Sequence, residues 1–200
     1  MVQHIHSITA LLLFFIPVTL WGQIKVTSEK IENQELLDFF RFEGIQYEKM
    51  SFTSKEQKIK TFRLSVKEIW DGKIMKDSTV FDNSNAFGNI RITIDDTIFT
   101  MRVISKLTED SKLKMQFAFP GFSITRNFDA TNSNGYSLRN AIETETVEFG
   151  KKFYALVYML PYQKDGIGYY CAVEASGKEI ETWGKEFGIK HYLVFEIIFE

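Results

Sequence analysis

The stretch "TFRLSVKEIWDGKIMKDSTVF", residues 61–81, alternates apolar and polar side chains and carries an Asp-Gly pair near its middle. Side chains of an extended chain point to opposite faces in turn, so Leu64 and Val66 share one face. Asp71-Gly72 is typical of the two-residue turn between paired strands, because such turns need positive φ at both positions. This stretch therefore predicts an antiparallel hairpin with one face toward a core.

The same two-residue rhythm recurs along most of the chain on either side of this hairpin. Turn residues separate further strand-like segments at residues 90–94, 98–107, 112–119, 122–128, 151–162 and 191–199. Strands of this length at such regular intervals are typical of antiparallel sandwiches and barrels. Apolar residues fill both faces of 151–162 and 191–199, so we expect these two segments to be covered on both sides.

Two segments depart from this pattern and predict short helices. Residues 27–40 have apolar side chains at helical spacing, and Ser28 or Asn33 can cap their start. Residues 176–187 begin with a serine three positions before a glutamate, the spacing of a capping box. The predicted fold is mainly β, with α+β character at its margins. We expect an antiparallel β-sandwich or partly open barrel with one short N-terminal helix and one short helix before the last strand.

The N-terminus indicates where the protein goes. Residues 8–22, "ITALLLFFIPVTLWG", form an apolar run that is short for a spanning helix and ends in a small residue. This is typical of a secretory signal cleaved after Gly22, with an uncleaved anchor as the alternative. We therefore expect a signal peptide at 1–22 and a single mainly antiparallel β domain at 23–200. The expected location is the periplasm, the cell surface or the extracellular space.

Charge and composition argue against several classes of function. The formal net charge of −2 argues against nucleic-acid binding, which needs a dense basic patch. Residues 23–200 contain no long uncharged apolar run, so we expect no membrane span in the mature chain. Cys171 is the only cysteine, so no intramolecular disulfide can form and stability must come from packing.

Few residues are available for nucleophilic or metal-assisted catalysis. His191 is the only histidine after the signal, so any Ser-His-Asp or Cys-His arrangement would have to use it. It opens an apolar strand, where a lone histidine is typical of hydrogen-bonded structure. Cys171 follows two tyrosines, a setting typical of a small buried hydrophobe, and with His191 it leaves a zinc site two ligands short. We therefore expect no catalytic residue, no metal and no cofactor.

The stretch "NFDATNSNGY", residues 127–136, has the oxygen donors of a calcium loop without its spacing. With Gly135 at the sixth position of an EF-hand loop, Ala130 and Ala141 fall at positions that require carboxylates. A looser calcium site would use three other donors: Asp129, Asn132 and Asn134. We interpret the stretch as a corner in which Asn134-Gly135 supplies the positive φ of a tight turn.

Aromatic residues are the one enriched resource for binding. Tyr154, Tyr158 and Tyr162 are even numbers of residues apart, so they share a face if this segment is one regular strand. Such a row, with Trp183 nearby in the sequence, can stack on a sugar or line a ligand cleft. The alternative is packing at the rim of the core. These four residues are the predicted ligand-binding site.

Four phrases of the sequence resemble a group of bacterial proteins: "WGQ" (21–23), "FEGIQYEKMSF" (42–52), "YYCAVEASGKEIETWGKEF" (169–187) and "IKHYLVFEI" (189–197). The chain resembles uncharacterised exported proteins of the gut-bacterial Bacteroidales type, which are small families described as domains of unknown function. The resemblance covers most of residues 23–200. It implies an exported protein of a Gram-negative bacterium and brings no catalytic residue with it.

These observations lead to one expected function and two alternatives. We expect an exported, non-enzymatic β domain of the cell envelope that binds a partner protein or a small-molecule or glycan ligand, or that is structural. A carbohydrate-active or carbohydrate-binding protein with an aromatic platform is the first alternative. A small outer-membrane β-barrel is the second, because apolar residues alternate in the last strand. That strand is apolar on both faces except at Glu196, which we expect to be exposed or paired.

Overall fold

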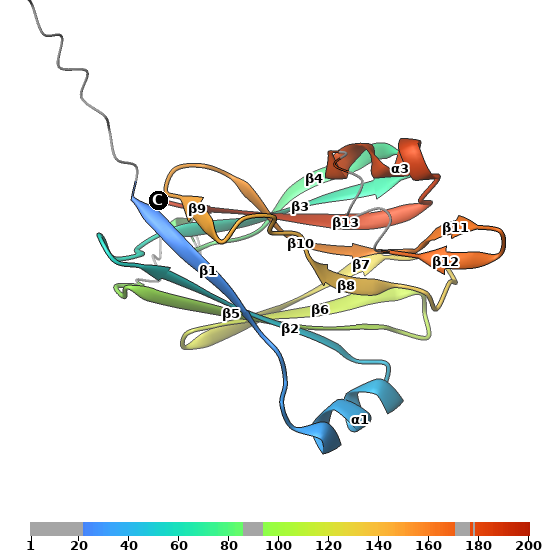
Figure 1. The fold of residues 1–200 in the computed structure, drawn as a ribbon, viewed down its shortest axis with the longest axis horizontal. Coiled ribbons are helices and arrows are strands. Elements are labelled where there is room, and N and C mark those ends of the chain that lie inside the picture. Colours follow the sequence, from blue (N-terminus) through green and yellow to red (C-terminus); the bar gives the residue numbers. More distant parts are fainter. Residues whose placement is uncertain (1–21, 86–93, 171–176, 178) are drawn as a thin grey trace, which may run out of the picture.

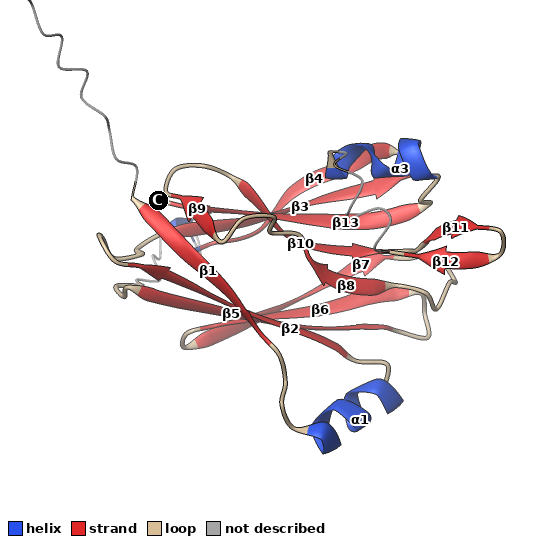
Figure 2. Cartoon of the chain, in the orientation of Figure 1, coloured by secondary structure: helices blue, strands red, loops and turns tan. Residues whose placement is uncertain are grey.

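The computed structural model of the protein describes residues 22–85, 94–170, 177 and 179–200. Its strands form two antiparallel sheets stacked face to face (Figure 1). The few helices lie outside the two sheets (Figure 2). The predicted mainly β fold is confirmed, and the described strands form a sandwich in which neither sheet closes on itself.

The larger sheet has six strands in the order β7-β6-β5-β2-β1-β9. Their bounds are β1 (Gln23–Glu29), β2 (Gln46–Ser54), β5 (Ile98–Leu107), β6 (Lys112–Phe119), β7 (Phe122–Asp129) and β9 (Thr146–Glu148). The second sheet has five strands in the order β4-β3-β13-β10-β8. Their bounds are β3 (Phe62–Trp70), β4 (Lys73–Asp82), β8 (Ser137–Asn140), β10 (Phe153–Met159) and β13 (His191–Phe199). A separate hairpin pairs β11 (Tyr162–Lys164) with β12 (Ile167–Tyr169).

The hairpin predicted from residues 61–81 is the β3–β4 pair. Asp71 and Gly72 have φ of 47° and 72°, so both turn positions are left-handed as this turn requires. Leu64 and Val66 face the core and are at most 1% exposed. The alternation that the sequence shows therefore corresponds to one buried face and one outer face of β3.

Strand β13 lies at the centre of the five-stranded sheet and is buried on both sides. On its inner face Phe199 packs with Phe52 of the opposite sheet, ring centroids 5.0 Å apart. Phe195 packs there with Phe117 of β6 at 5.3 Å. Each buried phenylalanine contributes about 1.5–3 kcal/mol to folding, so this interlayer cluster stabilises the sandwich. The prediction that the last strand is covered on both faces is confirmed.

Both predicted helices are present, with different boundaries. Helix α1 (Gln34–Phe42) begins after Asn33, whose side-chain oxygen accepts a hydrogen bond from the Leu36 amide at 3.0 Å. Asn33, and not Ser28, is therefore the cap, and residues 27–29 belong to β1. The second helical segment consists of η2 (Ile180–Thr182) and α3 (Trp183–Phe187), and η2 has no side-chain cap.

The corner at residues 127–136 is real, but its predicted cause is wrong. Neither Asn134 nor Gly135 has a positive φ. A Cβ at Gly135 would lie 3.3 Å from Cδ of Pro161, so the glycine is explained by close packing against the neighbouring chain. The residues that follow form the two short strands β8 and β9, one in each sheet.

Some predictions fall on residues outside the described ranges. These are the signal at 1–21, Ile90 and Ile92, Cys171 and the capping Ser176. Within the described part of the chain, no helix has the length and apolar character needed to cross a membrane.

Candidate functional site

The predicted tyrosine row does not form, because β10 contains a bulge. Tyr154 pairs with Glu196 of β13, whereas Leu156 pairs with Phe195, so one extra residue is inserted between them. The insertion turns the rest of the strand over, since side chains alternate between faces. Tyr154 therefore points to the outer side of the sheet, and Tyr158 is fully buried between the sheets. The expectation that these tyrosines share one face is wrong.

The other two predicted residues lie elsewhere. Tyr162 is on the β11–β12 hairpin and packs against Phe187 of α3, with ring centroids 5.6 Å apart. Trp183 is 4% exposed and lies beside Tyr192 under the helical segment. Tyr154 and Tyr158 line different cavities of the described residues. The four residues therefore do not form one aromatic platform.

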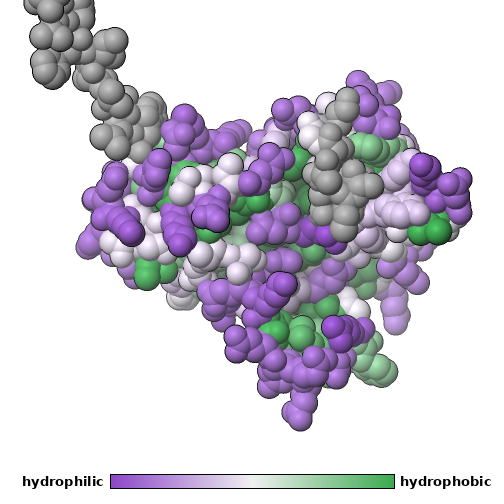
Figure 3. Space-filling view, viewed as in Figure 1, coloured by the Kyte–Doolittle hydropathy of each residue, from purple (hydrophilic) through white to green (hydrophobic). Residues whose placement is uncertain are grey.

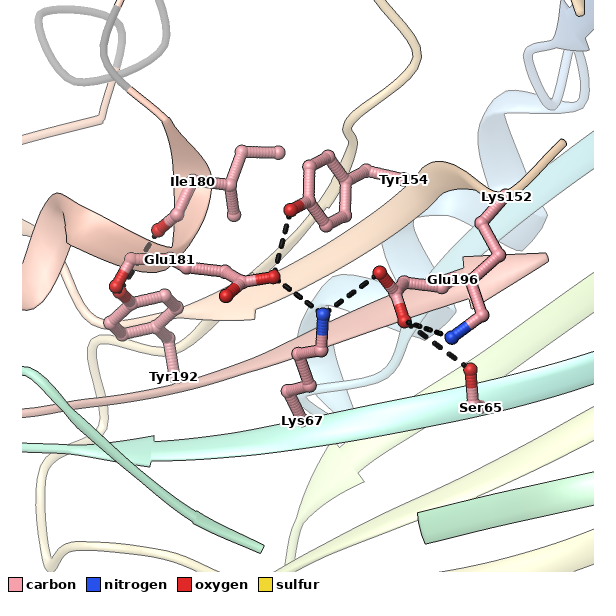
Figure 4. Close-up of polar contacts among 8 residues, drawn as sticks. All are labelled: Ser65, Lys67, Lys152, Tyr154, Ile180, Glu181, Tyr192 and Glu196. Atoms are coloured by element: carbon pink, nitrogen blue, oxygen red, sulfur yellow. Dashed lines mark hydrogen bonds and ion pairs between the residues drawn. The ribbon is translucent and has the colours of Figure 1, made fainter. Parts of the chain in front are cut away.

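Tyr154 belongs to a charged network on the outer face of the five-stranded sheet (Figure 4). Lys67 of β3 donates to Glu181 of η2 at 2.5 Å and to Glu196 at 2.9 Å. The Tyr154 hydroxyl donates to the same oxygen of Glu181 at 2.8 Å. Lys152 lies 3.7 Å from Glu196, which is therefore paired, as predicted for the polar exception on its strand.

The charges of this network make it a clamp and not a catalytic pair. Burial alone would lower the pKa of Lys67, but its hydrogen bonds to the two carboxylates raise it well above the ordinary value. Burial alone would raise the pKa of Glu181, but hydrogen bonds from Lys67 and Tyr154 lower it. A general acid needs a raised carboxyl pKa, and a lysine nucleophile needs a lowered one. The network instead fastens η2 to the sheet through ion pairs.

His191 is enclosed in the core, as predicted for a structural histidine. It is fully buried, its ring stacks on Trp70 at 3.9 Å, and its Nδ1 lies 2.5 Å from the Tyr136 hydroxyl. Burial lowers its pKa to about 4, so it is neutral at physiological pH. A side chain without access to solvent cannot reach a substrate in this conformation, so His191 carries no catalytic site here.

Two of the three donors of the alternative calcium site are engaged with other side chains. Asp129 pairs with Lys112, and Asn132 accepts a hydrogen bond from Ser111 at 2.7 Å. Among the residues that the structure describes, no group of three or more His, Cys, Asp or Glu side chains is placed to hold a metal ion.

The largest hollow that we identify in the described residues lies beside helix α1, and we call it the α1 groove. Its volume is about 560 Å³, within the range of ligand pockets, roughly 300–1,000 Å³. Apolar walls come from Ile31, Leu37, Phe40, Ile45, Tyr47 and Leu138. Charged residues at its margins are Glu29, Lys30, Arg41, Glu48 and Arg139. The groove runs from α1 across the start of β2 to the edge strand β8.

Helix α1 leaves much of its apolar face uncovered. Leu36, Phe39 and Phe42 are 41%, 55% and 86% exposed, and no residue of the helix is buried. Its aromatic contact with the sandwich is Phe40 against Tyr47 of β2, with ring centroids 6.1 Å apart. Figure 3 shows apolar side chains at the surface of the lobe that this helix forms. Of this helix, Leu37, Phe40 and Arg41 line the α1 groove, so the three exposed residues form a separate apolar side of the helix. An exposed apolar patch is typical of a binding surface.

Two carboxylates line the α1 groove, and their pKa values shift in opposite directions. Hydrogen bonds from Lys49 and Ser51 lower the pKa of Glu29, whereas burial raises that of Glu48. Tyr47, Lys49 and Ser51 alternate along β2 and point to its outer side. Glu48 lies between Tyr47 and Lys49 in the sequence, so it points to the opposite side. The carboxylate of Glu29 follows its partners to the outer side. The pair therefore does not face across the groove, as a glycosidase pair would.

Comparison with known proteins adds no family to this geometry. No family model matches the chain, and no curated protein and no solved structure matches it significantly. The α1 groove was not predicted from the sequence, although its signal was present. The helical spacing of Leu36 and Phe39 predicts an apolar face, but a sequence does not show whether such a face is covered.

Proposed function

We propose that the protein is an exported, non-enzymatic β-sandwich domain of the cell envelope that binds a partner or ligand at helix α1, in the α1 groove and on the exposed apolar side of the helix. Two observations carry this proposal: the groove, whose helical wall holds Leu37 and Phe40, and the exposed apolar side of the same helix, where Phe39 and Phe42 are more than half exposed. Export is supported by the signal-like sequence of residues 1–22. A non-enzymatic role is supported by the burial of His191 and the divergent directions of Glu29 and Glu48.

The chemistry of the groove fits a partly apolar occupant. Burying one exposed leucine or phenylalanine side chain yields about 1.5–3 kcal/mol, so covering α1 can supply useful affinity. Glu48 and Lys30 provide polar contacts that orient the occupant at the margins. The aromatic-platform alternative has less support, because the bulge in β10 separates Tyr154 from Tyr158.

An apolar dye tests the exposed apolar side of helix α1. Nile red should gain fluorescence on binding residues 23–200, and the double variant Phe39→Ser, Phe42→Ser should lose most of that gain. Ile167→Ser is the matched control, because Ile167 is 56% exposed on the distant β11–β12 hairpin. Equal fluorescence for the double variant and the wild type would show that α1 is not the binding surface.

Export is tested separately by expressing the full chain in a Gram-negative host. We expect the protein in the periplasmic or surface fraction with Gln23 as its first residue, measured by mass spectrometry. Recovery of the uncleaved chain in the cytoplasm would contradict the export proposal and leave the binding proposal standing.

A further inference from the structure

Strand β1 has a neighbouring strand on both sides over only part of its length. Strand β2 pairs with residues 24–29 of β1, whereas β9 pairs with residues 23–25 alone. Figure 1 shows β9 beside the start of β1 and helix α1 beyond its end. Among the described residues, no strand therefore lies beside residues 27–29 on the side opposite β2. We call this side of residues 27–29 the open edge of β1.

The backbone of Ser28 points outward along this open edge. Val26, two residues earlier, donates its amide to the Glu145 carbonyl at 2.9 Å, on the side where β9 lies. Alternate residues of a strand direct their N–H and C=O groups to the same side, so those of Ser28 also face away from β2. Ser28 is exposed, and the strands that the structure describes leave its amide and carbonyl unpaired.

The open edge of β1 borders the α1 groove. Ser28, Glu29 and Lys30 line the groove from the larger sheet, and residues 138–140 of the edge strand β8 line it from the second sheet. Extended peptides bind at such sites, because main-chain hydrogen bonds to an open strand edge supply affinity and pockets for alternate side chains supply specificity. A small apolar molecule would make no use of the Ser28 amide and carbonyl, so the groove fits a peptide better.

The groove walls favour apolar side chains at alternate positions of that peptide. Leu37 and Phe40 of α1 and Leu138 of β8 line the hollow. Every second side chain of an extended chain points the same way, and four residues span roughly 13 Å. A segment that pairs along residues 27–30 therefore directs about two side chains toward these walls and about two toward solvent.

The charges at the groove margin favour an acidic peptide. Glu29 is already paired with Lys49 at 2.6 Å. Burial raises the pKa of Glu48, and the charge of Arg139 acts to lower it, so this carboxylate also has a cation nearby. Lys30 is exposed and, in the described part of the chain, forms no ion pair. A carboxylate of the peptide beside Lys30 thus meets an unengaged cation, whereas a lysine there meets a like charge.

We propose that the α1 groove binds an extended acidic peptide, which pairs with the open edge of β1 through the backbone of Ser28. This inference rests on the proposed function of the α1 groove and names the class of its partner. Alternate apolar side chains of the peptide contact Leu37 and Phe40, and an acidic side chain between them lies beside Lys30. A segment that becomes ordered as it binds gives part of its interaction energy to that ordering, so we expect micromolar to millimolar affinity.

The test uses residues 23–200 and a fluorescein-labelled hexapeptide in which valine and glutamate alternate. Fluorescence polarisation measures its affinity, and amide hydrogen exchange followed by NMR reports on the Ser28 amide. We expect saturable binding and slower exchange of that amide in the complex. Two comparison peptides should bind more weakly: one with three valines followed by three glutamates, which loses the alternation, and one in which valine alternates with lysine.

Ser28→Pro tests the backbone pairing. Proline has no N–H and is tolerated on an edge strand where that N–H faces away from the sheet, so the variant should fold. It should weaken peptide binding about tenfold, the effect of one lost hydrogen bond. Ser28→Ala is the matched control, because it removes the hydroxyl and keeps the amide, and it should bind the peptide as the wild type does.

Two further measurements make the test independent of that variant. Should Ser28→Pro fail to fold, peptides N-methylated at alternate residues provide the same test: methylation of the set that faces β1 should weaken binding more than methylation of the other set. Lys30→Glu should weaken binding of the glutamate peptide and strengthen that of the lysine peptide. The double variant Phe39→Ser, Phe42→Ser should bind the peptide normally, because neither residue lines the groove.

Four results would overturn the proposal. The first is that the alternating valine–glutamate peptide does not bind saturably. The second is that Ser28→Pro binds it as tightly as Ser28→Ala and the Ser28 amide is not protected. The third is that a comparison peptide binds equally well, which would exclude strand pairing or the preference for acidic residues. The fourth is a dimer of the free domain that Ser28→Pro abolishes, which would assign the open edge to a second copy of this chain.

The dye experiment distinguishes failure of this inference from failure of the proposed function. Absence of peptide binding, with Nile red binding at α1 intact, would reject the peptide and leave helix α1 as a binding surface. Absence of both would reject the proposed function as well.

Discussion

Helices α3 and α1 lie outside opposite sheets of the sandwich, and only α3 is fastened down (Figure 1). Tyr192 of β13 accepts a hydrogen bond from the Gly184 amide and donates to the Ile180 carbonyl at 2.9 Å. Lys67 pairs with Glu181 just before α3. In α1 no residue is buried, and its three most exposed apolar residues face solvent. Each helix is a short segment outside a sheet, but α3 is part of the packed structure whereas α1 is available for binding.

Close backbone contact accounts for part of this difference. A Cβ at Gly184 would lie 2.6 Å from Cα of Gly72, so α3 rests directly on the β3–β4 turn. Gly44, which ends the α1 connection, has no heavy atom within 4 Å of its would-be Cβ. A helix that touches the sheet through glycine backbone cannot admit a ligand beneath it, whereas α1 leaves a groove.

The largest expected contrast comes from truncating one aromatic residue in each helix. Trp183→Ala should lower the free energy of unfolding by about 3–5 kcal/mol, because it empties a buried site. Phe39→Ala should change it by less than about 0.5 kcal/mol, because the side chain is already solvent-exposed. Urea denaturation of both variants measures the two values. A loss for Phe39→Ala as large as for Trp183→Ala would mean that α1 is packed in solution.

A smaller contrast compares one lysine from each side. Lys67→Ala leaves Glu196, whose side chain is 8% exposed, without its closest cation, and should cost about 2–3 kcal/mol. Lys49→Ala breaks the exposed pair with Glu29 beside the α1 groove and should cost about 0–1 kcal/mol. Thermal and urea unfolding provide the comparison. Equal costs would show that the Lys67 network is no more than a surface ion pair.

The strands were predictable because their determinants are local. Asp71-Gly72 favours the β3–β4 turn through the backbone preferences of these two residues, and the double-sided apolar pattern of residues 191–199 requires a covered strand. Glu196 was recognisable as paired because a carboxylate on a buried strand needs a cation. These features depend on neighbours along the chain and on the general cost of burying charge.

The sites were less predictable because they depend on distant contacts. One bulge beside Ala155 separates Tyr154 from Tyr158, and nothing in the local alternation announces it. Asn134-Gly135 is a pair typical of tight turns, yet Gly135 does not have a positive φ. The close approach of Pro161 explains why a glycine is needed at this position. The complete burial of Tyr158 appears only when the two sheets are brought together. Sequence reasoning selected Tyr158 as a binding residue but placed it on the wrong face.

The smallest expected contrast is in how stability depends on pH, and its sign differs between Glu181, beside α3, and Glu48, beside α1. Hydrogen bonds from Lys67 and Tyr154 outweigh burial and hold the pKa of Glu181 below 4.5. The ionised Glu181 therefore stabilises the fold fully above pH 4.5, and this stabilisation is lost as pH falls through the folded-state pKa. Burial raises the pKa of Glu48 above 4.5, so its destabilising effect is complete above that raised pKa and is relieved as pH falls through it toward 4.5.

Urea denaturation between neutral pH and pH 3 separates these two carboxylates. At neutral pH Glu181→Gln should be less stable than the wild type and Glu48→Gln more stable, and both differences should shrink in acid. His191, whose pKa burial lowers to about 4, makes every protein here less stable as pH falls below 6.5, so each variant is compared with the wild type at the same pH. A Glu48→Gln variant that is less stable than the wild type at neutral pH would mean that the charge of Arg139, which acts to lower the pKa of Glu48, outweighs the cost of burying Glu48. The groove beside α1 would then be organised by an ion pair, as the covered side is.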